Sequence, residues 1–100
     1  MSYQILVGLY VTDDRLYSDY REAMTPILES YGGGFGYDLK VSQVLKSETT
    51  EPINRVFTIV FEDRASKNDF FSDSAYLEIK SKYFEPSVSH TTLIADYELA

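Results

Sequence analysis

Two segments of the chain carry apolar side chains on both faces when they are read as strands. In Tyr3–Val11 the apolar positions recur at the two-residue period of a strand, and the intervening positions include Leu6 and Tyr10. Arg55–Glu62 is rich in β-branched and aromatic residues on both faces, and Val60 lies opposite its main apolar set. We therefore expect two central strands that need cover on both sides.

The segments that follow these strands have the spacing of amphipathic helices. Apolar residues recur at helical intervals over residues 14–31, and Asp13 is placed to cap that helix. Pro26 lies inside the pattern and predicts either a kink or a late start. A second helical region spans residues 65–84, with a break near Ser72.

Three consecutive glycines, residues 32–34, follow the first predicted helix. A glycine at this place caps a helix, because it adopts left-handed backbone angles without steric cost. A phosphate-binding loop is the less favoured alternative, since such loops precede helices.

Two further strands complete the predicted order of elements. Residues 35–46 and 89–97 alternate in the manner of strands, and in the second one Leu93 should share a face with Ala95, opposite Asp96. The order β-α-β-β-α-β predicts an α+β, ferredoxin-like fold, with a four-stranded antiparallel sheet and both helical regions on one face. Its length of 100 residues corresponds to one domain, residues 1–100.

The sheet face opposite the helices should be a large exposed apolar patch in a monomer. The second sheet of a homodimer is the simplest cover, and it would enclose a cavity between the two sheets that could hold a small-molecule ligand. The residues expected on this face are Leu6, Tyr10, Val56, Val60 and Ile94.

Charge and composition exclude several classes of function. A net charge of -7 argues against nucleic acid and anionic membranes as partners, because phosphate contacts need clustered lysine and arginine. The chain has no cysteine, which excludes disulfides and thiolate chemistry and fits a cytoplasmic location. We expect no membrane span and no signal peptide, because the apolar start is short and has no basic flank.

Several motifs resemble an uncharacterised bacterial family, domain of unknown function 1330. They are Asp13 with Tyr17 and Tyr20, Pro26, Tyr31-Gly32-Gly33 with Phe35, the strand from Val56 to Phe61, and Ser72-Asp73-Ser74-Ala75-Tyr76. The resemblance implies the dimeric α+β barrel superfamily, which also holds cofactor-free monooxygenases, muconolactone-isomerase-like enzymes and heme-handling proteins. It implies a fold and a dimer rather than a reaction. Family members often carry charged side chains on the inward face of strands one and three, where this chain has Gly8, Tyr10 and Val60.

Two residues are candidates for acid/base catalysis. His90 is the only histidine, and histidine is the residue type suited to acid/base chemistry near neutral pH. Asp96 is a carboxylate within an apolar strand, so it is either held in a wet cavity or exposed as an edge-strand charge. With regular alternation, His90 and Asp96 would lie on the same face. A metal site is not expected from a single histidine without cysteine, and no cofactor is expected.

Tyr10, Thr58 and Arg55 are the candidate ligand contacts, the first two on the predicted cavity face and Arg55 as a partner for a carboxylate. The remaining tyrosines, including Tyr17, Tyr20, Tyr31 and Tyr83, are assigned to helix packing. We expect a cofactor-independent enzyme or binder of a small aromatic or carbonyl compound. The alternative is a non-catalytic structural or ligand-sensing dimer, and heme ligation by His90 is a third hypothesis.

Overall fold

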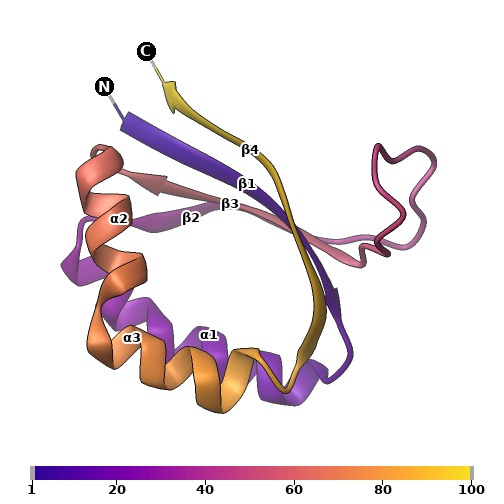
Figure 1. Ribbon diagram of the computed structural model, residues 1–100, viewed down its shortest axis with the longest axis horizontal. Helices are drawn as coiled ribbons and strands as arrows, with labels where there is room; N and C mark the ends of the chain where they lie inside the picture. The colour runs from indigo at the N-terminus through magenta and orange to yellow at the C-terminus, as the bar shows by residue number, and fades with distance from the viewer. Residues whose placement is uncertain (1, 100) are drawn as a thin grey trace.

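The computed structural model describes residues 2–99 as a four-stranded antiparallel sheet covered on one face by helices (Figure 1). The strand order is β2-β3-β1-β4, so β1 and β3 are central as predicted. The elements are β1 (Ser2–Val11), α1 (Asp14–Ser30), β2 (Gly34–Lys40), β3 (Arg55–Phe61), α2 (Arg64–Ser72), α3 (Ser74–Ile79), the π-helical turn η1 (Lys80–Phe84) and β4 (Val88–Leu99).

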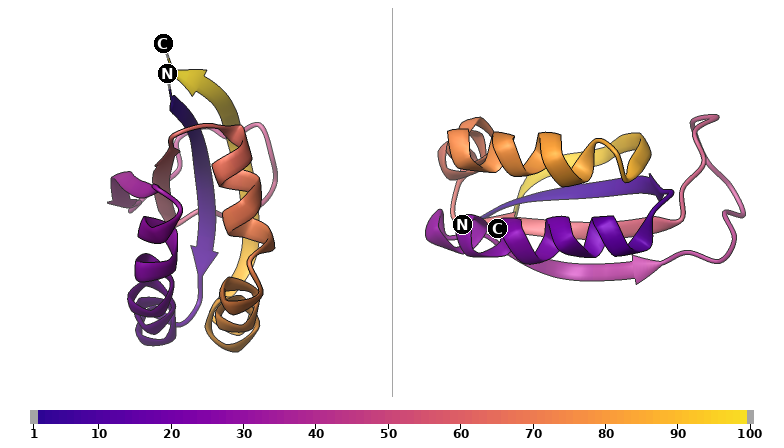
Figure 2. Two further views of the ribbon diagram at one scale, coloured as in Figure 1. Left: turned by 90° about the vertical axis from the view of Figure 1, so that its left-hand side faces the viewer. Right: turned by 90° about the horizontal axis from the view of Figure 1, so that it is seen from below.

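The core lies between the sheet and the helices. Figure 2 shows α1 and the α2–α3 unit side by side on the same face of the sheet. The odd-numbered residues of β1, from Tyr3 to Val11, are all buried, and so are Phe57, Ile59 and Phe61 of β3. The predicted α+β, ferredoxin-like fold is therefore confirmed.

Helix α1 begins and ends at residues that the sequence marks for those roles. The Asp13 carboxylate accepts a hydrogen bond from the Leu16 backbone N–H at 3.0 Å. Gly32 has a φ of 75°, the left-handed angle expected of a glycine cap. The late start suggested by Pro26 is wrong, because the helix runs from Asp14 to Ser30 with Pro26 inside it.

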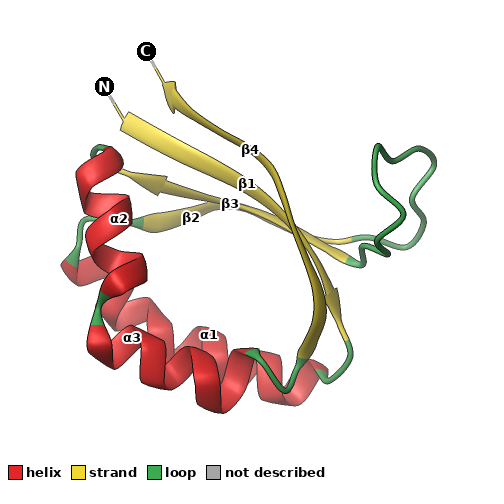
Figure 3. Ribbon diagram, in the orientation of Figure 1, coloured by secondary structure: helices red, strands yellow, loops and turns green. Residues whose placement is uncertain are grey.

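The second predicted strand is shorter than its alternating pattern suggested. β2 ends at Lys40 rather than near residue 46, and residues 41–54 form a loop that projects away from the sheet (Figure 3). The Asn54 side chain ends the loop by bonding both the N–H and the C=O of Val11, at 2.8 and 2.9 Å. These two bonds occupy main-chain groups at the end of β1, so the loop returns to the sheet at a fixed point.

The edge strand β4 does not alternate regularly. Val7 of β1 pairs with Leu93, whereas the preceding Leu6 pairs with Ala95, so Ile94 is an extra residue in the ladder. The bulge places Leu93 on the helix face and Ala95 on the outer face. Our expectation that these two residues share a face is therefore wrong.

Candidate functional site

A cavity of about 320 Å³ lies between the sheet and the helices, on the side of the edge strand β4. Its floor is formed by side chains of β1 and β3 that also build the core, such as Leu9 and Ile59. Residues of all the helical elements and of β4 form its walls. An apolar cavity with a few polar groups is the usual form of a small-molecule site.

Two buried tyrosines place a pair of hydroxyl groups at this cavity. The Tyr20 and Tyr76 oxygens are 2.9 Å apart, and both residues line the cavity. Burial raises the pKa of Tyr20 far above its ordinary value and also raises the pKa of Tyr76. Both phenols are therefore neutral hydrogen-bonding groups over the physiological pH range.

Two half-buried lysines, Lys67 of α2 and Lys80 of η1, are the only charged side chains that line the cavity in the described part of the chain. Lys80 lies at the start of the π-helical turn. The Lys80 backbone carbonyl accepts a hydrogen bond from the Glu85 N–H at 3.0 Å. Phe84, at the end of this turn, lines the cavity as well. Short π-helical turns are frequent at functional sites.

Three tyrosines of the motifs quoted above, Tyr20, Tyr31 and Tyr76, form one connected hydrogen-bond network with Asp73. The Tyr31 hydroxyl donates to the Asp73 carboxylate at 2.6 Å, and the same carboxylate caps α3 by accepting from the Tyr76 N–H at 2.9 Å. The hydrogen bond from Tyr31 lowers the pKa of Asp73. The network fixes the start of α3 and with it the position of Tyr76.

A second polar cluster ties β2 to α1. Asp38 binds Arg55 through both carboxylate oxygens, at 2.8 and 2.9 Å, and also binds Arg21 at 2.8 Å. The Arg21 guanidinium lies 3.6 Å from the centre of the Phe35 ring and donates to the Tyr17 hydroxyl. The hydrogen bond from Arg55 keeps the pKa of Asp38 below its ordinary value. Because Asp38 engages both arginines of this cluster, we assign the cluster to packing α1 on the sheet.

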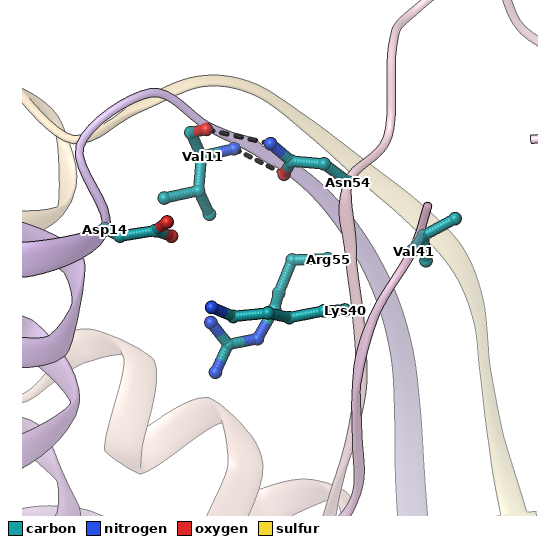
Figure 4. Close-up of a pocket in the computed structure, with 6 residues that line it drawn as sticks. All are labelled: Val11, Asp14, Lys40, Val41, Asn54 and Arg55. Atoms are coloured by element: carbon teal, nitrogen blue, oxygen red, sulfur yellow. Dashed lines mark hydrogen bonds between the residues drawn. The ribbon is translucent and has the colours of Figure 1, made fainter. Parts of the chain in front are cut away.

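A hollow of about 180 Å³ opens beside this cluster (Figure 4). Lys40 and Arg55 extend into it, while Asp14 faces them from the start of α1. The Asn54 bonds to Val11 close its upper end. The hollow is smaller than the cavity near β4, and only Val11 and Val41 among its described lining residues are apolar, so we do not treat it as the main site.

His90 and Asp96 lie on opposite faces of the sheet. His90 pairs with Tyr10 in the ladder and lies 3.1 Å from Glu51 of the projecting loop, on the outer face. Asp96 pairs with Ile5, on the helix face, and its carboxylate is 3.8 Å from Lys67. The expectation that the two residues share a face is wrong, because the extra residue Ile94 reverses the alternation between them.

The three predicted ligand contacts are also separated. Tyr10 is exposed on the outer face. Thr58 is buried, and its hydroxyl accepts the Tyr37 backbone N–H at 2.7 Å, which leaves the hydroxyl engaged by β2. Arg55 is held by Asp38 as described above. None of the three lines the cavity near β4.

The polar residues that line this cavity were not among the predicted site residues. Tyr20 was expected only to pack the helices, and Lys67 and Lys80 were not predicted to have a role in a site. A signal was present, because Tyr76, Lys80 and Phe84 are spaced by four residues, which places a lysine on the inward face of an apolar helix.

The described residues contain no grouping of three or more metal-ligating side chains. No helix within residues 2–99 is long and apolar enough to cross a membrane.

Comparison with known families gives a match over almost the entire chain. The family model described as domain of unknown function (DUF1330) matches residues 2–97. The chain belongs to this family. The resemblance seen in the tyrosine and glycine motifs is thereby confirmed. No functionally curated protein matches the chain.

Solved structures similar to this DUF1330 chain agree on the fold. A protein of unknown function from Rhodopseudomonas palustris has a TM-score of 0.83 at 17% identity, over 99% of this chain and 82% of the other. A dabb family protein with a ferredoxin-like fold from Mesorhizobium loti has a TM-score of 0.71 at 15% identity, over 99% and 97%. A dimeric protein of unknown function and ferredoxin-like fold from Bacteroides fragilis has a TM-score of 0.63 at 13% identity, over 98% and 96%.

Proposed function

We propose that the protein binds a small aromatic or carbonyl compound in the cavity between the sheet and the helices near β4. The observation that carries the proposal is the cavity itself, of about 320 Å³ and largely apolar, with the Tyr20–Tyr76 hydroxyl pair among its lining residues. Its volume falls at the small end of ligand pockets, roughly 300 to 1,000 Å³. Aromatic walls and a few polar groups suit a ligand of one or two rings.

The binding proposal is tested by blocking the cavity from β4. Thr91 lines the cavity and is exposed, so Thr91→Phe places a ring there without disturbing a buried side chain. The measurement is ligand-observed NMR with a panel of neutral and charged single-ring compounds. We expect compounds that bind the wild type to lose binding in Thr91→Phe by about tenfold or more.

Ser81→Phe is the matched control for this experiment. Ser81 is exposed on η1 and does not line the cavity, so the added ring should leave binding unchanged. Compounds that bind Thr91→Phe and the wild type equally well would place the ligand elsewhere and sink the proposal. Failure of every compound in the panel to bind the wild type would also count against it.

A role in proton transfer is a second proposal. Asp96 is the better candidate for it, as a residue that does not itself line the cavity and would act through Lys67. The Asp96 carboxylate is 3.8 Å from Lys67, and Lys67 lines the cavity. His90 instead points to Glu51 across the outer face. If the bound compound is turned over, Asp96→Asn should lower turnover while leaving the dissociation constant within about threefold, whereas His90→Gln should change neither.

We further propose that the protein is a homodimer joined through the outer face of the sheet. Leu6, Val56 and Val60 are half-buried there, and Ile94 and Tyr10 are exposed, at 47% and 37%. A contiguous apolar face of this kind marks an interaction surface. The similar protein from Bacteroides fragilis is described as dimeric. A second copy of the chain is the occupant that these observations favour.

A further inference from the structure

The charges that line the cavity are all of one sign. Among residues 2–99, Lys67 and Lys80 are the only charged residues that line it, and no carboxylate of these residues does so. The chain as a whole carries a net charge of -7, so the positive charge at this cavity is opposite in sign to the net charge of the protein. We propose that the ligand is an organic anion, an aromatic carboxylate that carries a second oxygen group. This inference rests on the function proposed above and specifies the chemical class of the ligand.

Lys80 is the residue expected to bind the carboxylate. Its side chain is half-buried, and no ion pair to it is formed within residues 2–99. Lys67, in contrast, has Asp96 at 3.8 Å. An ammonium group without a partner beside an apolar cavity attracts an anion more strongly than one on the open surface does, because less water lies around it to screen the charge. The geometry thus provides one free positive charge at an apolar cavity.

The tyrosine pair accounts for the second oxygen group. Each hydroxyl has one proton, and the bond between Tyr20 and Tyr76 uses one of the two. Neither hydroxyl has another hydrogen-bond partner among the described residues. One O–H donor therefore remains for an acceptor in the cavity, such as a ketone or a phenolic oxygen. A compound with a carboxylate at one end of a ring and a carbonyl at the other satisfies both groups.

The test compares three probes on the full-length protein by isothermal titration calorimetry. They are 4-acetylbenzoate, its neutral amide 4-acetylbenzamide, and benzoate, which lacks the acetyl group. We expect 4-acetylbenzoate to bind the wild type about tenfold more tightly than the amide. Lys80→Met should reduce this advantage to within about twofold, while leaving amide binding unchanged.

Lys82→Met is the matched control, because Lys82 is exposed on the same turn and does not line the cavity. It should keep the full preference for the anion. If the amide binds as tightly as the carboxylate, or if the two lysine variants weaken carboxylate binding equally, the inference is overturned. NMR spectra of both variants establish that each is folded before binding is compared.

The tyrosine pair has a test of its own. The double variant Tyr20→Phe/Tyr76→Phe should weaken 4-acetylbenzoate by about fivefold and benzoate by less than twofold, because it removes both hydroxyls and only the first probe has an acceptor for their spare proton. Tyr20→Phe alone should change neither probe by more than about twofold, because the Tyr76 O–H is then free to donate. Tyr83→Phe, at a tyrosine outside the cavity, should affect neither probe. An equal loss for both probes in the double variant would overturn the role given to the pair.

These outcomes separate the inference from the proposed function. If the amide and the carboxylate bind equally and Thr91→Phe blocks both, the site is a binding site but not one for anions. If neither probe nor any compound of the panel binds, the proposed function fails together with the inference.

Discussion

At the scale of single residues, Asp38 shows how one carboxylate can hold two elements together. It binds Arg55 of β3 and Arg21 of α1 from its place in β2. The side chain is 33% exposed, so solvent weakens these ion pairs. The cluster nevertheless has three charged groups in contact, and such networks contribute more to the free energy of unfolding than isolated surface ion pairs do.

The acid stability of the protein should depend on Asp38. Its pKa is lowered in the folded state, so its contribution is present above the unfolded pKa, about 4, and is lost as the pH falls through the folded value. We expect Asp38→Asn to lower the free energy of unfolding by about 1 kcal/mol at pH 7, and by much less at pH 2. Urea unfolding at both pH values measures the difference.

Asp19→Asn is the control for this comparison, because Asp19 is exposed on α1 and takes part in none of the ion pairs between described residues. It should change stability by less than about 0.5 kcal/mol. An Asp38→Asn variant with the same loss at pH 2 as at pH 7 would show that the effect is not electrostatic.

At the scale of elements, α1 contains a proline in its interior, Pro26, at the cost of one helical hydrogen bond. Pro26 has no N–H, so the Glu22 carbonyl lacks its helical donor. Pro26 is exposed, and Pro26→Ala restores the bond without filling a buried site. Proline costs about 3 kcal/mol in a helix interior, offset by about 1 kcal/mol from the stiffer unfolded chain.

We therefore expect Pro26→Ala to raise the free energy of unfolding by about 2 kcal/mol. Chemical denaturation monitored by circular dichroism provides the measurement. Glu29→Ala, an exposed change on the same helix, should remain within about 0.5 kcal/mol of the wild type. A destabilised Pro26→Ala variant would mean that the proline is required for the path of α1.

The sequence was sufficient for the elements whose pattern is regular and insufficient where the register changes. The alternation in β1 and β3 and the caps at Asp13 and Gly32 were read correctly from local rules. The bulge at Ile94 was not predicted, because a bulge depends on the partner strand as well as on the sequence of the strand that contains it. The errors in placing Asp96 and Ala95 both follow from that one residue.

The candidate site could be predicted only in part, for a related reason. Tyr20, Lys67 and Lys80 come from three helical segments, and their meeting at one cavity depends on how those segments pack. Sequence spacing can place a residue on the inward face of its own helix. It does not show which inward-facing residues leave a space between them.

At the scale of the whole molecule, the outer face of the sheet should determine the oligomeric state. We expect sedimentation velocity to give a mass near twice the 11.5 kDa of the chain. Leu6→Glu should shift the protein to monomer, because it places a charge in the centre of the apolar face. Leu77→Glu, at a leucine exposed on α3, should leave the dimer intact. A wild-type mass of one chain at all concentrations would exclude the dimer.

The bulge in β4 changes which residues of the strand, odd-numbered or even-numbered, face the helices. On one side of Ile94 the odd-numbered Leu93 faces the helices, and on the other side the even-numbered Asp96 does so. Loss of the Ile94 codon alone would remove this bulge and leave both residues on their present faces, while the second register shift, between Tyr10 and Val11, would remain. A related gene that is shorter by one codon here could therefore encode the same helix face and the same outer face of β4. In that protein the residues after the deletion would have numbers lower by one, so odd and even positions would be exchanged although the faces are not.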